Sequence, residues 1–359
     1  MLHALIMAGG GGTRFWPRSR QSRPKQLLRL GGDRSLLQMT WERLEPCIPP
    51  ERTWVLTAAR LRDEVQAHLP AIPPHQIVGE PVARDTAPCV ALGAASVADR
   101  DPEAVMAVVP ADHIIEPPQE FGRVLHAAAE LVQDEPQAIV TIGISPTWPS
   151  TGYGYIQRGQ ELTPRQNLRV FQVRKFHEKP DRATAEVFLR SGEFYWNGGV
   201  FIARARTFLD QFRRHEPEIA QLADAIVARR RTDPSDRGFA DLFERMKKVS
   251  FDYAVMEKCP RILTIEARFR WDDVGSWLAL ERLHPQDATG NTILAEHVGV
   301  DTSRCIIVGE GKQIIATIGV SNLIIVQDGE CILVADRSRE GDVKKVVELM
   351  RQRGWERHL

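Results

Sequence analysis

The chain has 359 residues, and its 47 lysines and arginines balance 47 aspartates and glutamates, so its formal net charge is zero. This length predicts two domains, or one large domain with a small one, and is ample for a buried core. The balanced charge argues against a general binder of nucleic acid or membrane surfaces, which would need a basic excess. We therefore expect no nucleic acid and no membrane among the partners.

The five cysteines are scattered and include no CxxC pair, so the sequence predicts neither a disulfide framework nor a zinc site. The apolar run at residues 2–7 is too short for a signal peptide, and no long apolar run follows it. These observations predict a cytoplasmic protein.

The amino-terminal apolar run reads as a strand that leads into four glycines at residues 9–12. A strand that ends in glycines lets backbone N–H groups approach an anion, because no Cβ stands in the way. Arg14 and Lys25 follow, and these cations indicate an anion with several charges, such as a triphosphate. The residues of this stretch expected to bind the substrate are Gly9, Gly10, Gly12 and Thr13.

Two common phosphate-binding motifs do not fit this stretch. A P-loop needs GxxxxGK followed by Ser or Thr, and no such run occurs. A dinucleotide fingerprint needs GxGxxG, and Arg14 stands where its third glycine belongs. A long cation there suits phosphate binding better than a nicotinamide cofactor, so an oxidoreductase is disfavoured.

Strands and helices alternate in the prediction up to residue 142. The strands are expected at 53–57, 76–78, 104–109 and 138–142. The helices are expected at 35–45, where Ser35 and Gln38 fit a capping box, at 61–68, at 86–99, with Thr86 as N-cap, and at 121–133. This alternation predicts an α/β fold with a Rossmann-like, mostly parallel (mixed) sheet that helices cover on both faces. Ligands of such sheets bind at the carboxyl ends of the strands, where Arg14, Glu80 and Asp112 fall.

The pattern changes after Thr151, where the run TGYGY has turn chemistry. Asp252 is expected to cap a short helix at 253–258. The other elements expected here are strands at 169–177 and 262–267, a helix that Asp181 caps and that stops at Gly192, two helices within 205–230, and a loop at 233–238.

Short apolar runs recur after about residue 283, and Gly309, Gly319 and Gly329 stand ten residues apart. Strands and turns at regular spacing predict a small C-terminal β-helix-like domain with a closing helix at 342–353. The domains are therefore expected at 1–284 and 285–359. The exposed edges of a short β-domain make self-association into a homodimer plausible.

The runs AGGGGTRFWPRSR at 8–20 and PKQ at 24–26 resemble the signature of the sugar-nucleotide pyrophosphorylases. The FWP and PKQ runs favour the branch of the mannose-1-phosphate guanylyltransferases, and the resemblance extends over nearly the whole chain. It implies an enzyme that binds GTP and mannose 1-phosphate and forms GDP-mannose and pyrophosphate.

The resemblance also implies a site for Mg²⁺. In the family the Asp of PADH and the Asp of WxDxG bind the metal, and Asp112 and Asp273 match them. Carboxylates at separate strand ends suit Mg²⁺, which takes its other ligands from waters and phosphates. Asp272 stands where the family often has a small polar residue, so the sequence leaves open which of the two neighbours binds the metal.

The EKP run matches the family's sugar and phosphate contacts: Glu178 would accept from a sugar diol, and Lys179 would neutralise the sugar phosphate. Asn197 offers a donor and an acceptor to a sugar hydroxyl. Glu80 resembles the guanine contact, because a carboxylate accepts from the N1–H and N2–H₂ edge, although a capping or packing role is equally open. The remaining substrate-binding candidates are Asp85, Thr86, Gly152, Tyr153 and Gly199.

His113 is expected to contact a phosphate or ribose and not to act as a general base. The nucleophile would be a sugar-phosphate oxygen, which is largely ionised near neutral pH because its second pKa is about 6. Catalysis would then rest on positioning and charge neutralisation, in which Arg14 and Lys25 stabilise the departing pyrophosphate.

Two alternatives stay open. One is a guanylyltransferase for another manno-configured sugar 1-phosphate, such as a heptose, because nothing in the sequence reads the C2 epimer or the C6 substituent. The other is a non-catalytic subunit that senses nucleotide sugars. Such a subunit would be expected to lose Arg14, Lys25 or Asp112, and all three are present.

Overall fold

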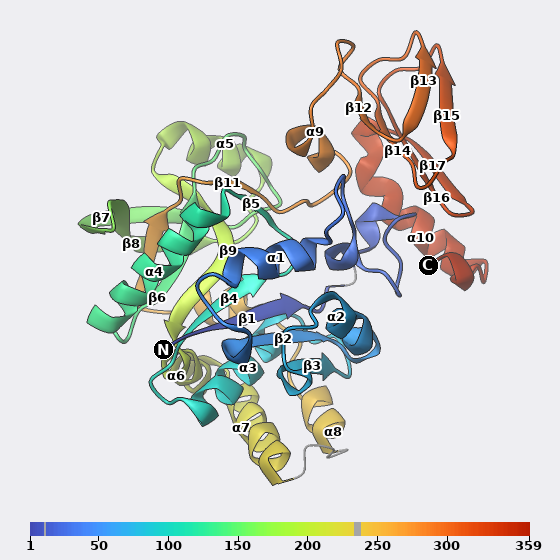
Figure 1. Cartoon of the computed structure of the whole chain (residues 1–359). Helices are drawn as coiled ribbons and strands as arrows, with labels where there is room; N and C mark the ends of the chain where they lie inside the picture. The colour runs from blue at the N-terminus through green and yellow to red at the C-terminus, as the bar shows by residue number, and fades with distance from the viewer. Residues whose placement is uncertain (11, 233–237) are drawn as a thin grey trace. The chain divides into compact units, whose positions relative to one another are not determined.

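The computed structural model describes the whole chain except residue 11 and residues 233–237 (Figure 1). Most of the loop predicted at 233–238 therefore lies outside the described residues. The described chain divides into two compact units that each combine distant stretches of sequence. Unit 1 comprises residues 1–9, 41–111 and 115–271, and unit 2 comprises residues 10–40, 112–114 and 272–359. The domain boundary expected between residues 284 and 285 stays a prediction.

Unit 1 is built on a nine-stranded sheet in which β9 runs antiparallel to its neighbours β4 and β6. Parallel pairing joins β3, β2, β1 and β4 on one side, and β6 with β10 on the other. In spatial order the strands are β3 (Ile77–Glu80), β2 (Thr53–Ala58), β1 (Leu2–Ala8), β4 (Val105–Pro110), β9 (Phe194–Arg204), β6 (Ile139–Ile144), β10 (Ile262–Glu266), β8 (Leu168–His177) and β7 (Tyr155–Arg165). The predicted α/β class with a mixed sheet is confirmed.

Helices cover both faces of this sheet. Met106 and Val108 of β4 share a core cluster with α3, whereas Ala107 and Val109 point to the other face and are also buried. Figure 1 shows α3, α6 and α7 together on one side of the sheet, and these helices contact one another. The helices of this unit are α2 (Arg62–His68), α3 (Thr86–Arg100), α4 (Pro118–Asp134), α5 (Arg182–Ser191), α6 (Ala205–His215), α7 (Pro217–Thr232) and α8 (Gly238–Glu244).

Two short elements lie beside these layers. Strand β5 (Ile114–Glu116) pairs with β11 (Arg270–Asp272) outside the large sheet. Helix α1 (Leu36–Leu44) begins with the predicted capping box, because the Ser35 hydroxyl accepts from Gln38 N at 3.2 Å and Gln38 Oε1 accepts from Ser35 N at 3.0 Å. No helix among the described residues is both long and apolar enough to span a lipid bilayer.

Unit 2 joins the amino-terminal segment to the C-terminal strands through one hydrophobic core. Phe15 meets Trp277 edge to face, with ring centroids 5.0 Å apart, and both belong to a cluster with Ile306 and Met350. Figure 1 shows the blue amino-terminal segment beside the red helix α10 (Val343–Gln352), and the two are in contact. The first stretch of this unit is therefore packed by residues near the other end of the chain.

The C-terminal strands of unit 2 stack as a β-helix-like coil, as predicted. Ile306 pairs with Ile324 and Glu296 with Ile314, which are 18 residues apart, whereas Thr292 pairs with Ile306, 14 residues apart. The glycines ten residues apart therefore mark turns and not the repeat itself. The strands are β12 (Thr292–Leu294), β13 (Glu296–Val300), β14 (Ile306–Val308), β15 (Ile314–Ile318), β16 (Leu323–Asp328) and β17 (Cys331–Asp336), with helix α9 (Ala279–Leu283) before them.

Candidate active site

In unit 2 the Lys25 ammonium links the two stretches that carry the predicted metal ligands. Its Nζ donates to Asp112 Oδ2 at 2.7 Å and to the main-chain oxygen of Asp273 at 2.5 Å. Lys25 opens a short 3-10 turn at Lys25–Leu27, whereas Asp112 follows β4 and Asp273 follows β11. Three segments that are far apart in sequence therefore meet at one cation.

The charge balance around Asp112 favours its ionised form. Burial by itself raises the pKa of Asp112, but the ammonium of Lys25 and the ring of His113 outweigh this effect, so the pKa lies below its usual range. The His113 Nε2 lies 3.9 Å from Asp112 Oδ1. His113 therefore sits beside the carboxylate and contributes to its charge environment.

The glycine-rich segment is shaped around Lys25. Gly12 has φ +50°, and a Cβ at this position would lie 2.6 Å from the Lys25 main-chain nitrogen, so only glycine fits. Gly12 precedes the 3-10 turn Thr13–Phe15, and within it Arg14 Nη1 lies 3.5 Å from the main-chain oxygen of Gly275. Gly10 has open space where a side chain would be, and its carbonyl accepts from Gln26 Nε2 at 3.3 Å.

The neighbours Asp272 and Asp273 differ in their surroundings. Asp272 is buried, and its two carboxylate oxygens accept from Arg282 at 2.5 and 3.0 Å. Its Oδ1 also accepts from the Val274 main-chain N–H at 2.7 Å. Asp273 is half-buried. The carboxylate oxygens of Asp272 are thus already engaged by Arg282 and by the Val274 main-chain N–H. We therefore expect Asp273 to be the ligand of a metal ion.

In unit 1, Glu80 lies buried at the end of β3 beside the end of β1. A Cβ on Gly9 would come within 2.8 Å of Glu80 Oε2, so the absence of a side chain at residue 9 makes room for the carboxylate. Burial raises the pKa of Glu80 to about 7, although a hydrogen bond with the Cys89 thiol opposes the rise. Its Oε1 is buried and has no hydrogen-bond partner among the described residues. An orphaned acceptor of this kind is what a donor edge such as that of guanine would satisfy.

Asp85 and Thr86 form the start of α3. Asp85 has φ +65° and accepts from the Thr86 main-chain N–H at 2.9 Å, so Asp85 is the N-cap, whereas Thr86 was expected to be. The Thr86 hydroxyl accepts from Phe251 N at 2.8 Å and ties the helix start to that segment.

A second group of polar side chains in unit 1 centres on Glu178 and Asp252. Lys179, with φ +45°, places its Nζ 2.7 Å from Glu178 Oε1; the Glu178 side chain is 8% exposed and that of Lys179 is 59% exposed. Burial lowers the pKa of Lys179, but its bond to Glu178 outweighs this effect and the net pKa is raised. Asn197 Nδ2 donates to Asp252 Oδ1 at 3.1 Å. Asn197 thereby shares a neighbourhood with the predicted sugar contacts.

The sequence did not predict the surroundings of Asp252. This residue was expected to cap a helix at 253–258, but residues Asp252–Met256 form a π-helical turn, and the Ser250 hydroxyl accepts from the Tyr253 main-chain N–H at 3.3 Å. Burial and the nearby Glu178 raise the pKa of Asp252 to about 7. The signal in the sequence was weak, because Asp before an apolar run is far more often a cap.

The predicted glycines lie next to these groups. Gly199, with φ +69°, donates its N–H to Asn197 Oδ1 at 3.2 Å, and the same oxygen accepts from the Thr141 hydroxyl at 3.1 Å. Gly152 N donates to the Ser150 hydroxyl at 3.2 Å. The ring of Tyr153 lies within an aromatic group that it forms with Trp148, Trp196 and Trp271, at centroid distances of 5.0 to 6.2 Å.

The donor set of unit 2 fits a divalent cation of the Mg²⁺ type. Asp112 and Asp273 offer carboxylate oxygens, and Mg²⁺ is commonly held by one or two carboxylates together with substrate phosphates. No cluster of three or more His, Cys, Asp or Glu side chains suited to a metal occurs in the described part of the chain. The set thus suits an ion whose remaining ligands come from phosphate and water.

Comparison with known proteins identifies the family. Residues 3–290 match the family model described as nucleotidyl transferase, and residues 295–350 match the mannose-P isomerase/GMP-like β-helix domain. The chain belongs to the nucleotidyl transferase family. Members of this family generally use a divalent metal ion.

Several members of the nucleotidyl transferase family cover nearly the whole chain. A mannose-1-phosphate guanylyltransferase of Klebsiella pneumoniae is 40% identical over 98% of this chain and 74% of its own length. One from Escherichia coli is 39% identical over the same shares. A crystal structure described as mannose-1-phosphate geranyltransferase from Thermus thermophilus has 35% identity and a TM-score of 0.86, covering 98% of this chain and 99% of that one.

Proposed function

We propose that this chain transfers GMP from GTP to mannose 1-phosphate, with release of pyrophosphate. The observation that carries the proposal is the meeting of Lys25 with Asp112 and the Asp273 main chain in unit 2. The curated relatives that match 98% of this chain carry the name mannose-1-phosphate guanylyltransferase, which supports the same reaction. The predicted cytoplasmic location and homodimer stay predictions.

The proposed roles in unit 2 concern the phosphates. Backbone N–H groups of the glycine-rich segment, with Arg14 and Lys25, bind the triphosphate and neutralise the charge that builds up on the departing pyrophosphate. Asp112 and Asp273 hold Mg²⁺, which when bound supplies further neutralisation of phosphate charge. The depressed pKa of Asp112 supports this role, because the ligand must be ionised.

The proposed roles in unit 1 concern the base and the sugar. Glu80 accepts from the guanine edge with its otherwise unpaired Oε1, and Asp85 and Thr86 border the nucleotide at the start of α3. Glu178 and Asn197 read sugar hydroxyls, and Lys179 neutralises the sugar phosphate. Gly152, Tyr153 and Gly199 shape the surface against which the sugar rests.

No general base is needed for the proposed reaction. The attacking sugar-phosphate oxygen is already largely ionised near neutral pH, so the chain has only to align it with the α-phosphorus of GTP. His113, placed beside Asp112, adjusts the charge there and takes no proton from the nucleophile.

The test is a matrix of nucleoside triphosphates against sugar 1-phosphates, with and without Mg²⁺, read by pyrophosphate release. The proposal expects release only when GTP, mannose 1-phosphate and a divalent ion are all present. If another manno-configured sugar 1-phosphate, such as a heptose 1-phosphate, is the preferred acceptor, that sugar would replace mannose 1-phosphate as the assigned substrate. Nucleotide-sugar binding without turnover in any combination would favour a sensing subunit instead.

A further inference from the structure

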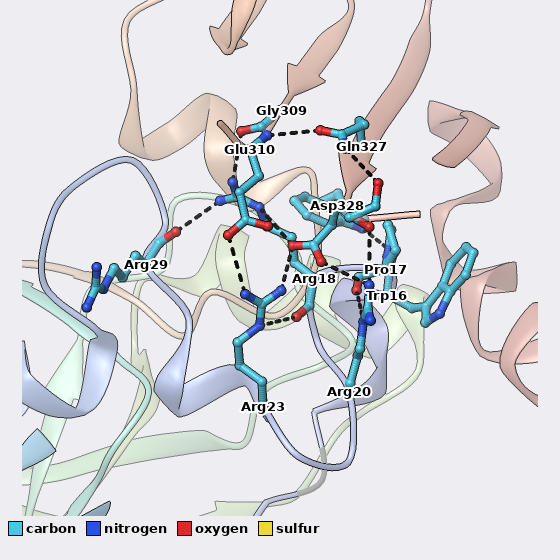
Figure 2. Close-up of polar contacts among 12 residues, drawn as sticks. Trp16, Pro17, Arg18, Arg20, Arg23, Arg29, Gly309, Glu310, Gln327 and Asp328 are labelled. Atoms are coloured by element: carbon cyan, nitrogen blue, oxygen red, sulfur yellow. Dashed lines mark hydrogen bonds and ion pairs between the residues drawn. The ribbon is translucent and has the colours of Figure 1, made fainter. Parts of the chain in front are cut away.

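Three arginines of the amino-terminal segment of unit 2 surround one buried aspartate of its C-terminal strands (Figure 2). Asp328, at the end of β16, is only 4% exposed. Its Oδ1 accepts from Arg20 Nη2 at 3.0 Å, and its Oδ2 accepts from Arg23 Nη2 at 2.5 Å. The Nε of Arg18 lies 3.8 Å from the same Oδ2. One carboxylate therefore faces three guanidinium groups.

The same arginine side chains also fix the backbone of their own segment, residues 17–24. Arg20 Nε donates to the Pro17 carbonyl and Arg23 Nε to the Arg18 carbonyl, each at 3.1 Å. Arg20 and Arg23 exchange two main-chain hydrogen bonds of 3.0 Å. The contacts with Asp328 and the internal bonds of this turn are thus made by the same groups.

Arg18 extends the contact to a neighbouring turn of the C-terminal strands. Its Nη2 donates to the Gly309 carbonyl at 2.9 Å, and its Nη1 donates to the Arg29 carbonyl at 3.1 Å (Figure 2). Glu310 lies 3.5 Å from Arg23 but is half exposed. Its main-chain N–H is held by Gln327 Oε1 at 3.1 Å. The turn at 17–24 therefore rests on β16 and on the segment after β14.

Charge makes this arrangement dependent on Asp328. Three guanidinium groups repel one another, and the repulsion is strongest where solvent is excluded. Asp328 supplies the buried negative charge, whereas the half-exposed Glu310 is screened by solvent. Removing the charge of Asp328 leaves the three cations to separate toward solvent, and the turn they close would loosen with them.

The turn leads directly into the proposed catalytic lysine. Pro24 ends it, and Lys25 follows with its backbone packed against Gly12. From this backbone position the Lys25 ammonium reaches Asp112 Oδ2 at 2.7 Å. A displacement of residues 17–24 is therefore transmitted to Lys25.

We propose that Asp328 is a positioning residue for the catalytic reaction. By neutralising Arg18, Arg20 and Arg23, it holds the turn at 17–24 in the conformation that places the Lys25 ammonium on Asp112. Its kinetic consequence rests on the proposed function, whereas the turn itself is a property of the fold.

The test replaces the charge and keeps the shape, in Asp328→Asn of the full chain. Hydrogen exchange of peptides that cover residues 17–24 should become about tenfold faster, since the Arg20 and Arg23 amides are bonded within this turn. In pyrophosphate-release assays kcat/KM for GTP should fall about 10- to 100-fold, because Lys25 is misplaced, while the KM for mannose 1-phosphate stays within about twofold. Asp328→Glu, which restores the charge, should recover most of both effects.

The matched control is Asp342→Asn. Asp342 also lies in the C-terminal part of unit 2 and pairs with Arg339 and Lys345, each at 2.8 Å, but this ion pairing is on the surface. The control should leave exchange at 17–24 and both kinetic constants unchanged.

Unchanged exchange at 17–24 in Asp328→Asn would overturn the positioning role, whatever the activity. An equal rise in the KM for GTP and in the KM for mannose 1-phosphate would overturn it too, because general loosening would then explain the data. If the wild-type chain shows no transferase activity, the proposed function fails, and the exchange experiment alone decides whether Asp328 holds the turn. If Asp328→Asn does not fold, Arg23→Gln takes its place, and it should give the same pattern more weakly.

Discussion

In unit 2 the Asp112 carboxylate accepts a hydrogen bond from the Lys25 ammonium at 2.7 Å, and this contact helps to hold the pKa of Asp112 below its usual range. In unit 1 Glu80 is buried and Asp252 is half-buried, and the loss of solvent around each carboxyl group raises its pKa to about 7. The first arrangement keeps a fixed negative charge at neutral pH, as a metal ligand requires. The second gives side chains that are poised between accepting and donating a hydrogen bond. We infer that neutralisation of the triphosphate charge belongs to unit 2, whereas unit 1 recognises the hydrogen-bonding groups of the base and the sugar and, through Lys179, the sugar phosphate.

The largest effect should come from breaking the fixed charge of unit 2. Asp112→Asn removes the ionised oxygen that faces Lys25, and kcat for pyrophosphate release should fall about 10²- to 10³-fold. Asp63→Asn, an exposed aspartate in the first turn of α2, is the control and should have wild-type kcat. Wild-type activity in Asp112→Asn would remove this residue from the catalytic group.

A comparison of Asp272 with Asp273 in unit 2 should distinguish a carboxylate that stabilises the fold from one that binds the metal ion. Asp272→Asn weakens the two hydrogen bonds between buried Asp272 and the partly exposed Arg282 and should lower the free energy of unfolding by about 2 kcal/mol, with the Mg²⁺ dependence of activity unchanged. Asp273→Asn should change stability by less than about 1 kcal/mol but raise the Mg²⁺ concentration needed for half-maximal activity. Denaturant titration and Mg²⁺ titration measure the two. The opposite pattern would assign the metal to Asp272.

A smaller effect is expected from the exposed cation of unit 1. Lys179→Ala should raise the KM for mannose 1-phosphate about tenfold with little change in the KM for GTP, because one charge-assisted contact with the sugar phosphate is lost. Lys175→Ala, an exposed lysine of β8, serves as the control. An unchanged KM for the sugar phosphate in Lys179→Ala would count against this role.

The smallest effect is a pH dependence of stability that comes from the Asp252 carboxyl group of unit 1. The folded pKa of Asp252 is raised to about 7 from an unfolded value near 3.8, so the folded state binds the extra proton between these values. Its contribution to stability is complete below about pH 4 and is lost as the pH rises through 7. Asp252→Asn, which still offers an acceptor to Asn197, should raise Tm by about 2–5 °C at pH 8 and have little effect at pH 4. Thermal melts at both pH values test this, and an equal shift at both would contradict the assignment.

Local chemistry made several elements predictable from the sequence. The Ser35–Gln38 capping box at α1 needs only neighbouring residues, and so does the Asp181 cap of α5, whose carboxylate accepts from Thr184 N at 2.8 Å. The strand expected at 2–7 was predictable for the same reason and is present as β1. The α/β class followed from the alternation of such elements.

Long-range contacts decided what the sequence could not reveal. Strand β9 was missed because its Asn197-Gly198-Gly199 run reads as a turn, yet pairing with β4 and β6 extends it. Asp252 was taken for a helix cap because its true partner, Asn197, is 55 residues away. Asp328, which pairs with the three arginines of the 17–24 turn, is likewise more than 300 residues away from them, so no local pattern in the sequence predicts the contact.

The bond from Trp16 Nε1 to the His358 carbonyl spans 342 positions of the chain at 2.9 Å. During synthesis the ribosome releases Trp16 long before His358. The amino-terminal segment of unit 2 must therefore wait without its hydrophobic support until the residues around His358 have been synthesised, 342 positions later. Contacts between such distant positions form slowly. We therefore expect this segment to depend on chaperones during synthesis and to be the first part to misfold in truncated chains.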